Sequence, residues 1–265
     1  MDDRPIGIFD SGVGGLTVCK AISDLLPSEN IIYFGDTARF PYGTRSIDTV
    51  VRYSREITEY LLSRDVKMLV IACNTSSAVA LDVLRKEYAL PIIGVIDAGA
   101  RASCARLKGD KIGVIATRAT VNSGSYVKAI NLLRSGIQVM QRHATLFVSL
   151  TEEGWLDDEI TRLTAKRYMQ GLYDEGVRTV ILGCTHFPLL KTAINGVYPE
   201  IDLVDTGIEI AREVRAILKE KNLENGGGAG HIELYASDIT DTIQRLKEMF
   251  FGNNGSEIKK LEING

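Results

Sequence analysis

Short runs of β-branched and aliphatic residues alternate with amphipathic stretches along nearly the whole chain. This pattern predicts strands at 5–9, 30–35, 67–73, 90–97, 111–117, 137–141, 179–184, 200–206 and 231–237. Helical periodicity predicts helices at 16–26, 46–64, 75–88, 122–135, 155–175 and 207–221. Strands that are apolar on both faces and separated by helices indicate an α/β fold with parallel sheets covered on both sides. Ligands of such folds bind at the carboxyl ends of the strands.

The chain also contains an internal repeat. The segment PIGIFDSGVGG, from Pro5, aligns with KIGVIATRATV, from Lys111, an offset of 106 residues. The segments around Cys73 and Cys184 align at a similar offset of 111 residues. The repeat predicts two similar lobes that present their thiols from opposite sides of a shared cleft.

Two stretches of small residues mark where the chain is expected to cross between the lobes. They are VIDAGARAS near residue 97 and VDTGIEI near residue 207. Lobe I is therefore predicted to contain residues 1–97 and 208–265, and lobe II residues 98–207. The glycine run at 225–230 is expected to be a surface loop, and the terminal stretch from 253 either an edge strand or a loose tail.

Charge and composition exclude several classes of protein. The formal charge of −3, from 31 basic and 34 acidic residues, gives no long-range attraction for nucleic acid or an anionic membrane surface. No apolar run approaches the ~18 residues of a membrane span, and the acidic start MDDRPIGIF differs from a signal peptide. A cytoplasmic location is therefore expected. The four cysteines form no C-x-x-C pair, which favours reduced thiols over a disulfide framework or a zinc site.

Cys73 and Cys184 each end an apolar run and precede hydrogen-bonding side chains. A bland interpretation is that each cysteine is the last small hydrophobe of a strand, with Asn74, Thr75 or Thr185 capping a helix. The repeat favours a second interpretation, because inversion of a carbon centre needs one acid/base group on each face. A thiol has a reference pKa of ~8.5, and a helix N-terminus lowers it further toward neutrality.

Candidate helpers lie near both thiols. Asp10 and Ser11 follow the first strand, where a helix cap before a glycine turn is the alternative; the GVGG spacing fits neither phosphate-binding fingerprint. His186 stands two residues after Cys184, where the alternative is a hydrogen-bonded structural histidine. Glu152 or Glu153 could orient that histidine or simply begin a solvated helix. The two remaining cysteines, at 19 and 104, lie in helical patterns and are expected to be inert packing residues.

Five segments together resemble glutamate racemases, of the cofactor-independent aspartate/glutamate racemase superfamily. The resemblance extends from about residue 5 to 250 and rests on IFDSGVGGLTV, YFGDTARFPYG, ACNTSSAVAL, TRATVNSGSY and LGCTHFPLL. It implies two lobes related by a pseudo-twofold axis with the active site between them. It also implies an isomerase that supplies D-glutamate for peptidoglycan, in cell-wall biogenesis and cell shape, without metal, nucleotide or pyridoxal phosphate.

The resemblance also implies residue roles. Cys73 would exchange the α-proton with D-glutamate and Cys184 with L-glutamate. Asp10 would assist Cys73, while His186, supported by one of the two glutamates Glu152 and Glu153, would assist Cys184. The substrate would be held by Asp10, Ser11, Tyr42, Gly43, Asn74, Thr75, Thr185 and His186.

Other functions stay open on the sequence alone. Aspartate racemisation by the same two-thiol scheme is the nearest rival, because one methylene changes binding by only ~1–3 kcal/mol. A non-catalytic two-lobed amino-acid-binding protein would need neither thiol, and a thiol redox protein would lack a resolving cysteine nearby. The expected partner is the small-molecule substrate, glutamate, rather than nucleic acid or membrane, and a homodimer is the default assembly.

Overall fold

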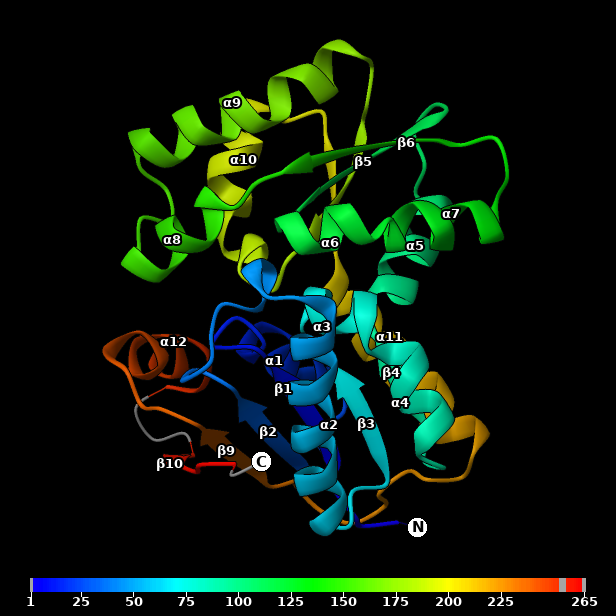
Figure 1. Cartoon of the computed structure of the whole chain (residues 1–265), viewed down its shortest axis with the longest axis vertical. Coiled ribbons are helices and arrows are strands. Elements are labelled where there is room, and N and C mark those ends of the chain that lie inside the picture. Colours follow the sequence, from blue (N-terminus) through cyan, green and yellow to red (C-terminus); the bar gives the residue numbers. More distant parts are fainter. Residues whose placement is uncertain (1, 253–255, 264–265) are drawn as a thin grey trace. The chain divides into compact units, whose positions relative to one another are not determined.

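The computed structural model describes residues 2–252 and 256–263 and contains two compact units (Figure 1). Residues 1–95 and 207–265 form unit 1, and residues 96–206 form unit 2. Each unit is a parallel sheet flanked by helices, as the alternating apolar pattern predicted. Among the described residues, no helix is both long enough and apolar enough to cross a membrane.

Unit 1 is built on a six-stranded sheet with the strand order β10-β9-β2-β1-β3-β4. Every strand pair in it is parallel. The strands are β1 (Ile6–Asp10), β2 (Ile31–Gly35), β3 (Met68–Ile71), β4 (Ile92–Gly94), β9 (Ile232–Ala236) and β10 (Ile258–Lys260). The three central strands β2, β1 and β3 are buried throughout, because helices cover both faces of the sheet.

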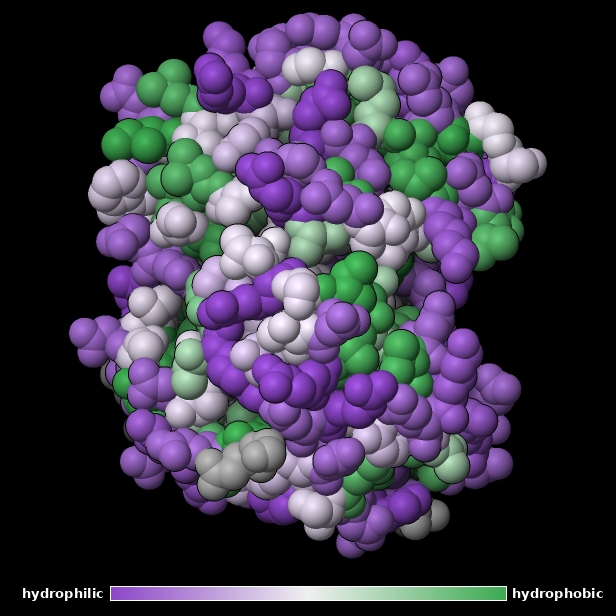
Figure 2. Space-filling view, in the orientation of Figure 1, coloured by the Kyte–Doolittle hydropathy of each residue, from purple (hydrophilic) through white to green (hydrophobic). Residues whose placement is uncertain are grey.

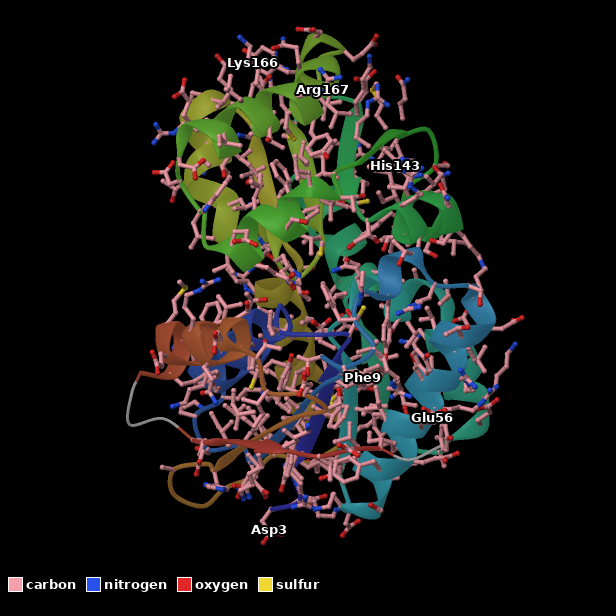
Figure 3. The ribbon with its side chains drawn as sticks, turned by 60° about the vertical axis from the view of Figure 1, so that its left-hand side comes forward. Asp3, Phe9, Glu56, His143, Lys166 and Arg167 are labelled. Atoms are coloured by element: carbon pink, nitrogen blue, oxygen red, sulfur yellow. The ribbon has the colours of Figure 1, made fainter. Side chains whose placement is uncertain are left out.

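The helices of unit 1 place apolar residues against this sheet. They are α1 (Leu16–Leu25), η1 (Tyr42–Thr44), α2 (Ile47–Ser63), α3 (Asn74–Val79), α4 (Leu81–Glu87), α11 (Thr206–Glu220) and α12 (Asp241–Phe251). Ile57 and Leu61 of α2 and Leu84 of α4 share one core with Phe9 of β1 (Figure 3). The side of α2 that faces the viewer in Figure 2 is mostly hydrophilic, so the helix is amphipathic, as its periodicity predicted.

Unit 2 is built on a four-stranded parallel sheet with the order β6-β5-β7-β8. Its strands are β5 (Lys111–Ala116), β6 (Gln138–His143), β7 (Thr179–Gly183) and β8 (Asp202–Asp205). Its helices are α5 (Val95–Ala105), α6 (Arg118–Ser123), α7 (Ser125–Leu133), α8 (Leu146–Glu153), α9 (Glu159–Asp174), η2 (Phe187–Leu190) and α10 (Lys191–Val197). Met169 of α9, Phe147 of α8 and Leu182 of β7 share one core, while Lys166 and Arg167 of α9 are exposed (Figure 3).

The internal repeat of the sequence is confirmed by the order of the strands. Unit 1 contains the run β2-β1-β3-β4 and unit 2 the run β6-β5-β7-β8, so β1 corresponds to β5 and β3 to β7. Ala72 alone separates Cys73 from the end of β3, and Cys184 directly follows the end of β7. The two thiols therefore occupy corresponding places at the carboxyl ends of corresponding strands.

Several predicted elements differ in their boundaries. The helix expected at 75–88 is divided at Ala80 into α3 and α4. The helix expected at 122–135 begins earlier and is broken at Gly124, whose φ of 64° lies in the left-handed region that favours glycine. The helix expected from 155 starts at Glu159 instead, because the Asp158 side chain caps it by accepting the Thr161 N–H.

Other segments adopt a structure that the periodicity did not predict or that the sequence left open. The strand expected at 90–97 ends at Gly94, and the small-residue stretch that follows it begins the helix α5. Residues 241–251 form α12, capped by Thr240. Residues 258–260 pair with β9 as an edge strand, while residues 253–255 and 264–265 of the predicted tail lie outside the described residues.

A buried ion pair stabilises the edge of unit 1 where its parallel strands begin. Lys67 and Glu29 side chains are 0% and 3% exposed, with 2.6 Å between Nζ and Oε2. Glu29 Oε1 also accepts the Asn225 N–H at 2.8 Å, and Lys67 Nζ donates to the Asp2 carbonyl at 2.7 Å. Removing one partner leaves the other charge buried without compensation.

We therefore expect Lys67→Met to lower the free energy of unfolding by about 3–5 kcal/mol. Arg55→Met, at the half-exposed pair Arg55–Glu87, is the control and should cost less than about 1 kcal/mol. Urea unfolding curves of the two variants and the parent protein measure both values. Equal losses of unfolding free energy in the two variants would show that the buried Lys67–Glu29 pair matters no more for stability than the half-exposed Arg55–Glu87 pair.

Candidate active site

Asp10 and Cys73 come together because β1 and β3 are neighbouring parallel strands. Phe9 pairs with Ile71, and the Ala72 N–H donates to the Phe9 carbonyl at 2.9 Å, so both chains leave the sheet side by side. Asp10 is 1% exposed and Cys73 4%. Ser11 is also buried, and the Cys73 thiol donates to its Oγ at 3.4 Å.

Cys73 is itself the N-cap of α3, which corrects the expectation that Asn74 or Thr75 would cap this helix. Its Sγ accepts the Ser76 N–H at 3.4 Å, the geometry of a side-chain cap. Asn74 and Thr75 lie instead in the first turn of α3, and both are buried. Ser76 was not among the predicted site residues. Its position three residues after Cys73 is the cap-to-N3 spacing that identifies it.

The pKa of Cys73 departs from the sequence-based expectation. Burial raises it, the nearby Asp10 carboxyl raises it further, and the hydrogen bonds with Ser11 and Ser76 oppose the rise, leaving the pKa at about 11. The Ser76 N–H at the start of α3 lowers this pKa, as expected of a helix N-terminus, but desolvation and the Asp10 carboxyl outweigh it, so the pKa is not brought toward neutrality. At neutral pH Cys73 is a protonated thiol that can give its proton to a carbanion.

Tyr42 and Gly43 lie in the short helix η1, and the Tyr42 ring packs against Cys73. The Tyr42 hydroxyl donates to Asp36, a fully buried carboxylate that also accepts Arg39 Nε at 2.6 Å. Burial and Asp36 hold the pKa of Tyr42 well above its usual range, so the hydroxyl stays protonated. Because that hydroxyl is hydrogen-bonded to Asp36, a ligand at the η1 turn would contact the backbone groups of the turn and not the Tyr42 hydroxyl.

The second cysteine is accompanied by a histidine and a glutamate. Cys184 Sγ lies 3.7 Å from His186 Nδ1, and His186 Nε2 lies 3.3 Å from Glu152 Oε1. Cys184, Thr185 and His186 are 7%, 4% and 2% exposed. The carboxylate beside the imidazole therefore belongs to Glu152 and not to Glu153, a choice that the sequence left open.

Aromatic packing brings that glutamate to the histidine. Phe187, the first residue of η2, lies edge-on against Phe147 of α8 with ring centroids 5.4 Å apart. This contact holds α8 against η2, and Glu152 stands in the last turn of α8. The Phe187 N–H also donates to the Cys184 carbonyl at 3.1 Å, which fixes the turn between the two functional side chains.

Opposing effects act on the pKa of His186. Burial lowers it, but the contacts with Cys184 and Glu152 outweigh burial and raise the pKa from 6.5 to about 10. At neutral pH the imidazole is therefore protonated, between a thiol sulfur and a carboxylate. Such a group can exchange a proton with the sulfur and stabilise negative charge on it.

The remaining cysteines and histidines lie apart from these groups. Cys19 is fully buried in α1, where burial raises its pKa to about 12, and Cys104 lies in α5. His143 is exposed at the end of β6 (Figure 3), and His231 is exposed before β9. Within residues 2–252 and 256–263, no three His, Cys, Asp or Glu side chains gather as a metal site would require.

The described side chains thus form two half-sites, each in its own unit. The first half-site contains a protonated thiol near a carboxyl group, with Ser11 and Ser76 on the sulfur. The second contains a thiol beside an imidazolium that a carboxylate supports. Each half-site holds one sulfur that can act as an acid or a base, and each sulfur has a different helper.

Comparison with known proteins identifies relatives over the whole chain. The family model described as Asp/Glu/Hydantoin racemase matches residues 6–213. A glutamate racemase from Geobacter metallireducens is 45% identical over 99% of this chain and 98% of its own length. Among solved structures, a Francisella tularensis glutamate racemase in complex with D-glutamate has a TM-score of 0.92 at 36% identity, over 100% of this chain and 99% of that chain. The RacE1 isoform from Bacillus anthracis has a TM-score of 0.95 at 32% identity, covering 99% of both chains.

Proposed function

This chain belongs to the Asp/Glu/Hydantoin racemase family, and from that premise we propose that it interconverts L-glutamate and D-glutamate. The name of the Geobacter metallireducens relative and the ligand in the Francisella tularensis structure support glutamate as the substrate. Both of those similarities extend over nearly the full length of the proteins compared. The product D-glutamate would serve peptidoglycan synthesis.

The observation that carries the proposal is the pair of thiols at corresponding strand ends, each with its own proton-handling neighbour. In the L-to-D direction, the Cys184 sulfur acts as a thiolate whose own proton is held on His186. It takes the α-proton, and the electron pair of the C–H bond stays on the α-carbon. The Cys73 thiol then gives its proton to the opposite face, and its sulfur keeps the S–H electron pair. The reverse direction uses the same groups in the opposite order, so the two sulfurs supply both acid/base functions without a further reagent.

The helpers restore each sulfur for the next turnover. After an L-to-D turnover, the His186 imidazolium can pass its Nε2 proton to Glu152 and take the new proton from the Cys184 thiol at Nδ1. Asp10 lies beside Cys73 and can return a proton to its thiolate. Both proton movements reverse in the D-to-L direction. A two-base scheme of this kind requires both half-sites to reach one bound glutamate, with one sulfur on each face of its α-carbon.

Glutamate carries one ammonium group and two carboxylates, so its binding needs several hydrogen-bonding partners. The half-sites offer buried, small polar side chains next to each sulfur, and the η1 turn adds backbone groups. The proposed substrate-binding residues are Asp10, Ser11, Tyr42, Gly43, Asn74, Thr75, Thr185 and His186. Polar groups desolvated in this way favour a substrate that satisfies all of them over one that leaves some unpaired.

The first test is proton NMR of L-glutamate, D-glutamate and L-aspartate in D2O with the purified protein and no added cofactor. We expect the α-proton signal of both glutamate enantiomers to disappear while the optical activity decays to the racemate. Aspartate should exchange at least about tenfold more slowly, since one methylene is worth ~1–3 kcal/mol. Faster exchange of aspartate than of glutamate would assign aspartate as the substrate. Binding of glutamate without exchange would show that the protein is a non-catalytic amino-acid-binding protein.

A further inference from the structure

We propose that Tyr33 is a positioning residue that fixes the carboxyl group of Asp10, an inference that rests on the proposed function. Tyr33 stands in the middle of β2 and is fully buried. Its hydroxyl donates to the Gly12 carbonyl at 2.6 Å. The same residue, Gly12, donates its N–H to Asp10 Oδ2 at 3.3 Å, so one loop residue joins the tyrosine to the carboxyl group.

The loop between β1 and α1 holds one oxygen of Asp10. Besides Gly12, the Gly15 N–H donates to Oδ2 at 2.8 Å. Two backbone donors on one oxygen restrict the rotation of the carboxyl group. The orientation of the Asp10 carboxyl group is therefore set in part by the path of residues 11–15.

This loop has no room to shift on the side of Tyr33. A Cβ atom added at Gly15 would lie 2.4 Å from Asp10 Cβ and 2.9 Å from Tyr33 Oη. A Cβ atom added at Gly35 would lie 2.7 Å from the Gly12 carbonyl oxygen. The loop backbone thus packs directly on Tyr33 and on the end of β2, and the Tyr33 hydroxyl anchors it at the centre of this contact.

Tyr33 also stays a hydrogen-bond donor across the working pH range. Burial and the nearby Asp10 carboxyl hold the pKa of Tyr33 well above its usual range. Parallel pairing of β2 with β1 aligns Tyr33 with Ile8, two residues before Asp10, so the sheet itself sets the height of the hydroxyl. A donor held by a central strand is a rigid support for a catalytic loop.

Tyr33 would act on the reaction only through Asp10. Asp10 influences the Cys73 thiol electrostatically, since it raises the pKa of that thiol. A shifted carboxyl group would serve Cys73 less well, and displacements of ~1 Å at a catalytic group can cost up to 100-fold in rate. Loss of the Tyr33 hydroxyl should therefore slow the half of the reaction that belongs to Cys73.

The test is Tyr33→Phe, which removes the hydroxyl and keeps the ring. We expect kcat/KM for glutamate to fall about tenfold, mostly in kcat. Primary isotope effects on kcat/KM with α-deuterated D- and L-glutamate give a second readout. The effect for D-glutamate, whose proton goes to Cys73, should rise relative to that for L-glutamate. A merely structural role would leave the ratio of the two isotope effects unchanged.

A double-mutant cycle with Asp10→Asn shows whether Tyr33 acts through Asp10. In the Asp10→Asn background, Tyr33→Phe should change kcat/KM by less than about twofold, because the group that it positions has already lost its function. Thr58→Val is the matched control. It likewise removes a fully buried hydroxyl that donates to a backbone carbonyl, at 2.7 Å from Ser54 O, and should leave kcat/KM within about twofold of the parent.

Two results would overturn this inference while leaving the proposed function intact. One is an active parent protein in which Tyr33→Phe matches Thr58→Val in both rate and isotope-effect ratio. The other is a tenfold loss that persists unchanged in the Asp10→Asn background. Failure of the parent protein to exchange the α-proton of glutamate would instead remove the proposed function, and the role of Tyr33 with it.

Discussion

Cys73→Ala and Cys184→Ala are each expected to lower the rate of glutamate inversion by at least ~1000-fold, the middle of the range for loss of a positioned acid/base group. Each substitution removes the only proton donor or acceptor that the proposed scheme has on one face of the α-carbon. Alanine is small enough to leave the buried surroundings of both sulfurs in place. The measurement is the decay of optical rotation for each variant, starting from each enantiomer.

The two variants should also differ from each other when exchange in D2O is followed without inversion. Cys184→Ala retains the sulfur that meets D-glutamate, so any residual wash-in of deuterium should favour that enantiomer. Cys73→Ala should show the opposite preference. Cys104→Ala is the control, because its side chain lies in α5 outside both half-sites, and it should retain parental activity. Inversion that survives either half-site substitution would exclude the two-thiol mechanism.

The general fold and the place of the thiols could be predicted because both depend on short-range pattern. Strands such as β1 and β3 are apolar on both faces, which is sufficient to indicate a parallel sheet. In such a sheet, side chains that directly follow neighbouring strands meet at one edge, so Asp10 was expected beside Cys73. The pairing of β1 with β3 provides that neighbourhood.

Other features depend on contacts that spacing does not encode. Glu152 and Glu153 are adjacent, and only the packing of Phe147 on Phe187 decides which of them meets His186. The role proposed for Tyr33 depends on a loop from another strand that comes within hydrogen-bonding distance. The raised pKa of Cys73 depends on burial, which a strand-end motif does not reveal. Local sequence thus predicts which groups are available, and tertiary packing decides their partners and protonation.

The helpers differ in charge, and this difference affects how the two halves respond to pH. The Cys184 neighbour is an imidazolium, whose pKa is raised to about 10 although burial alone would lower it. The Cys73 neighbour is a carboxyl group, which raises the pKa of the thiol. A rise in pH through the alkaline range therefore deprotonates the His186 imidazolium of the second half-site. In the first half-site the same rise converts the Cys73 thiol to a thiolate.

His186→Asn is expected to lower kcat by ~100-fold, the lower end of the range for a group that transfers protons. Asparagine keeps a hydrogen-bonding side chain but cannot carry a proton between Cys184 and Glu152. The primary isotope effect for L-glutamate, whose proton goes to Cys184, should rise relative to that for D-glutamate. His143→Asn is the matched control, because this histidine of the same unit is exposed at the end of β6 and should not alter kcat.

The same substitution tests the protonation state of His186 through stability. Its pKa is higher in the folded protein, about 10, than the ordinary value of 6.5, so the folded state binds the proton more tightly. The stabilisation is therefore complete below pH 6.5 and is lost as pH rises through about 10. The parent protein should lose stability relative to His186→Asn over this window. Glu152→Gln removes one source of the raised pKa of His186 and should therefore narrow this pH window.

Urea unfolding at pH 6, 8 and 10 measures this difference directly. We expect the unfolding free energy of the parent minus that of His186→Asn to decrease steadily across the three pH values. A difference that is independent of pH would mean that folding does not raise the pKa of the imidazole, and a difference that increases from pH 6 to 8 would mean that the buried imidazole is neutral. Proton transfer at Cys184 would then have to proceed without an imidazolium, and the asymmetry between the two half-sites would rest on Asp10 alone.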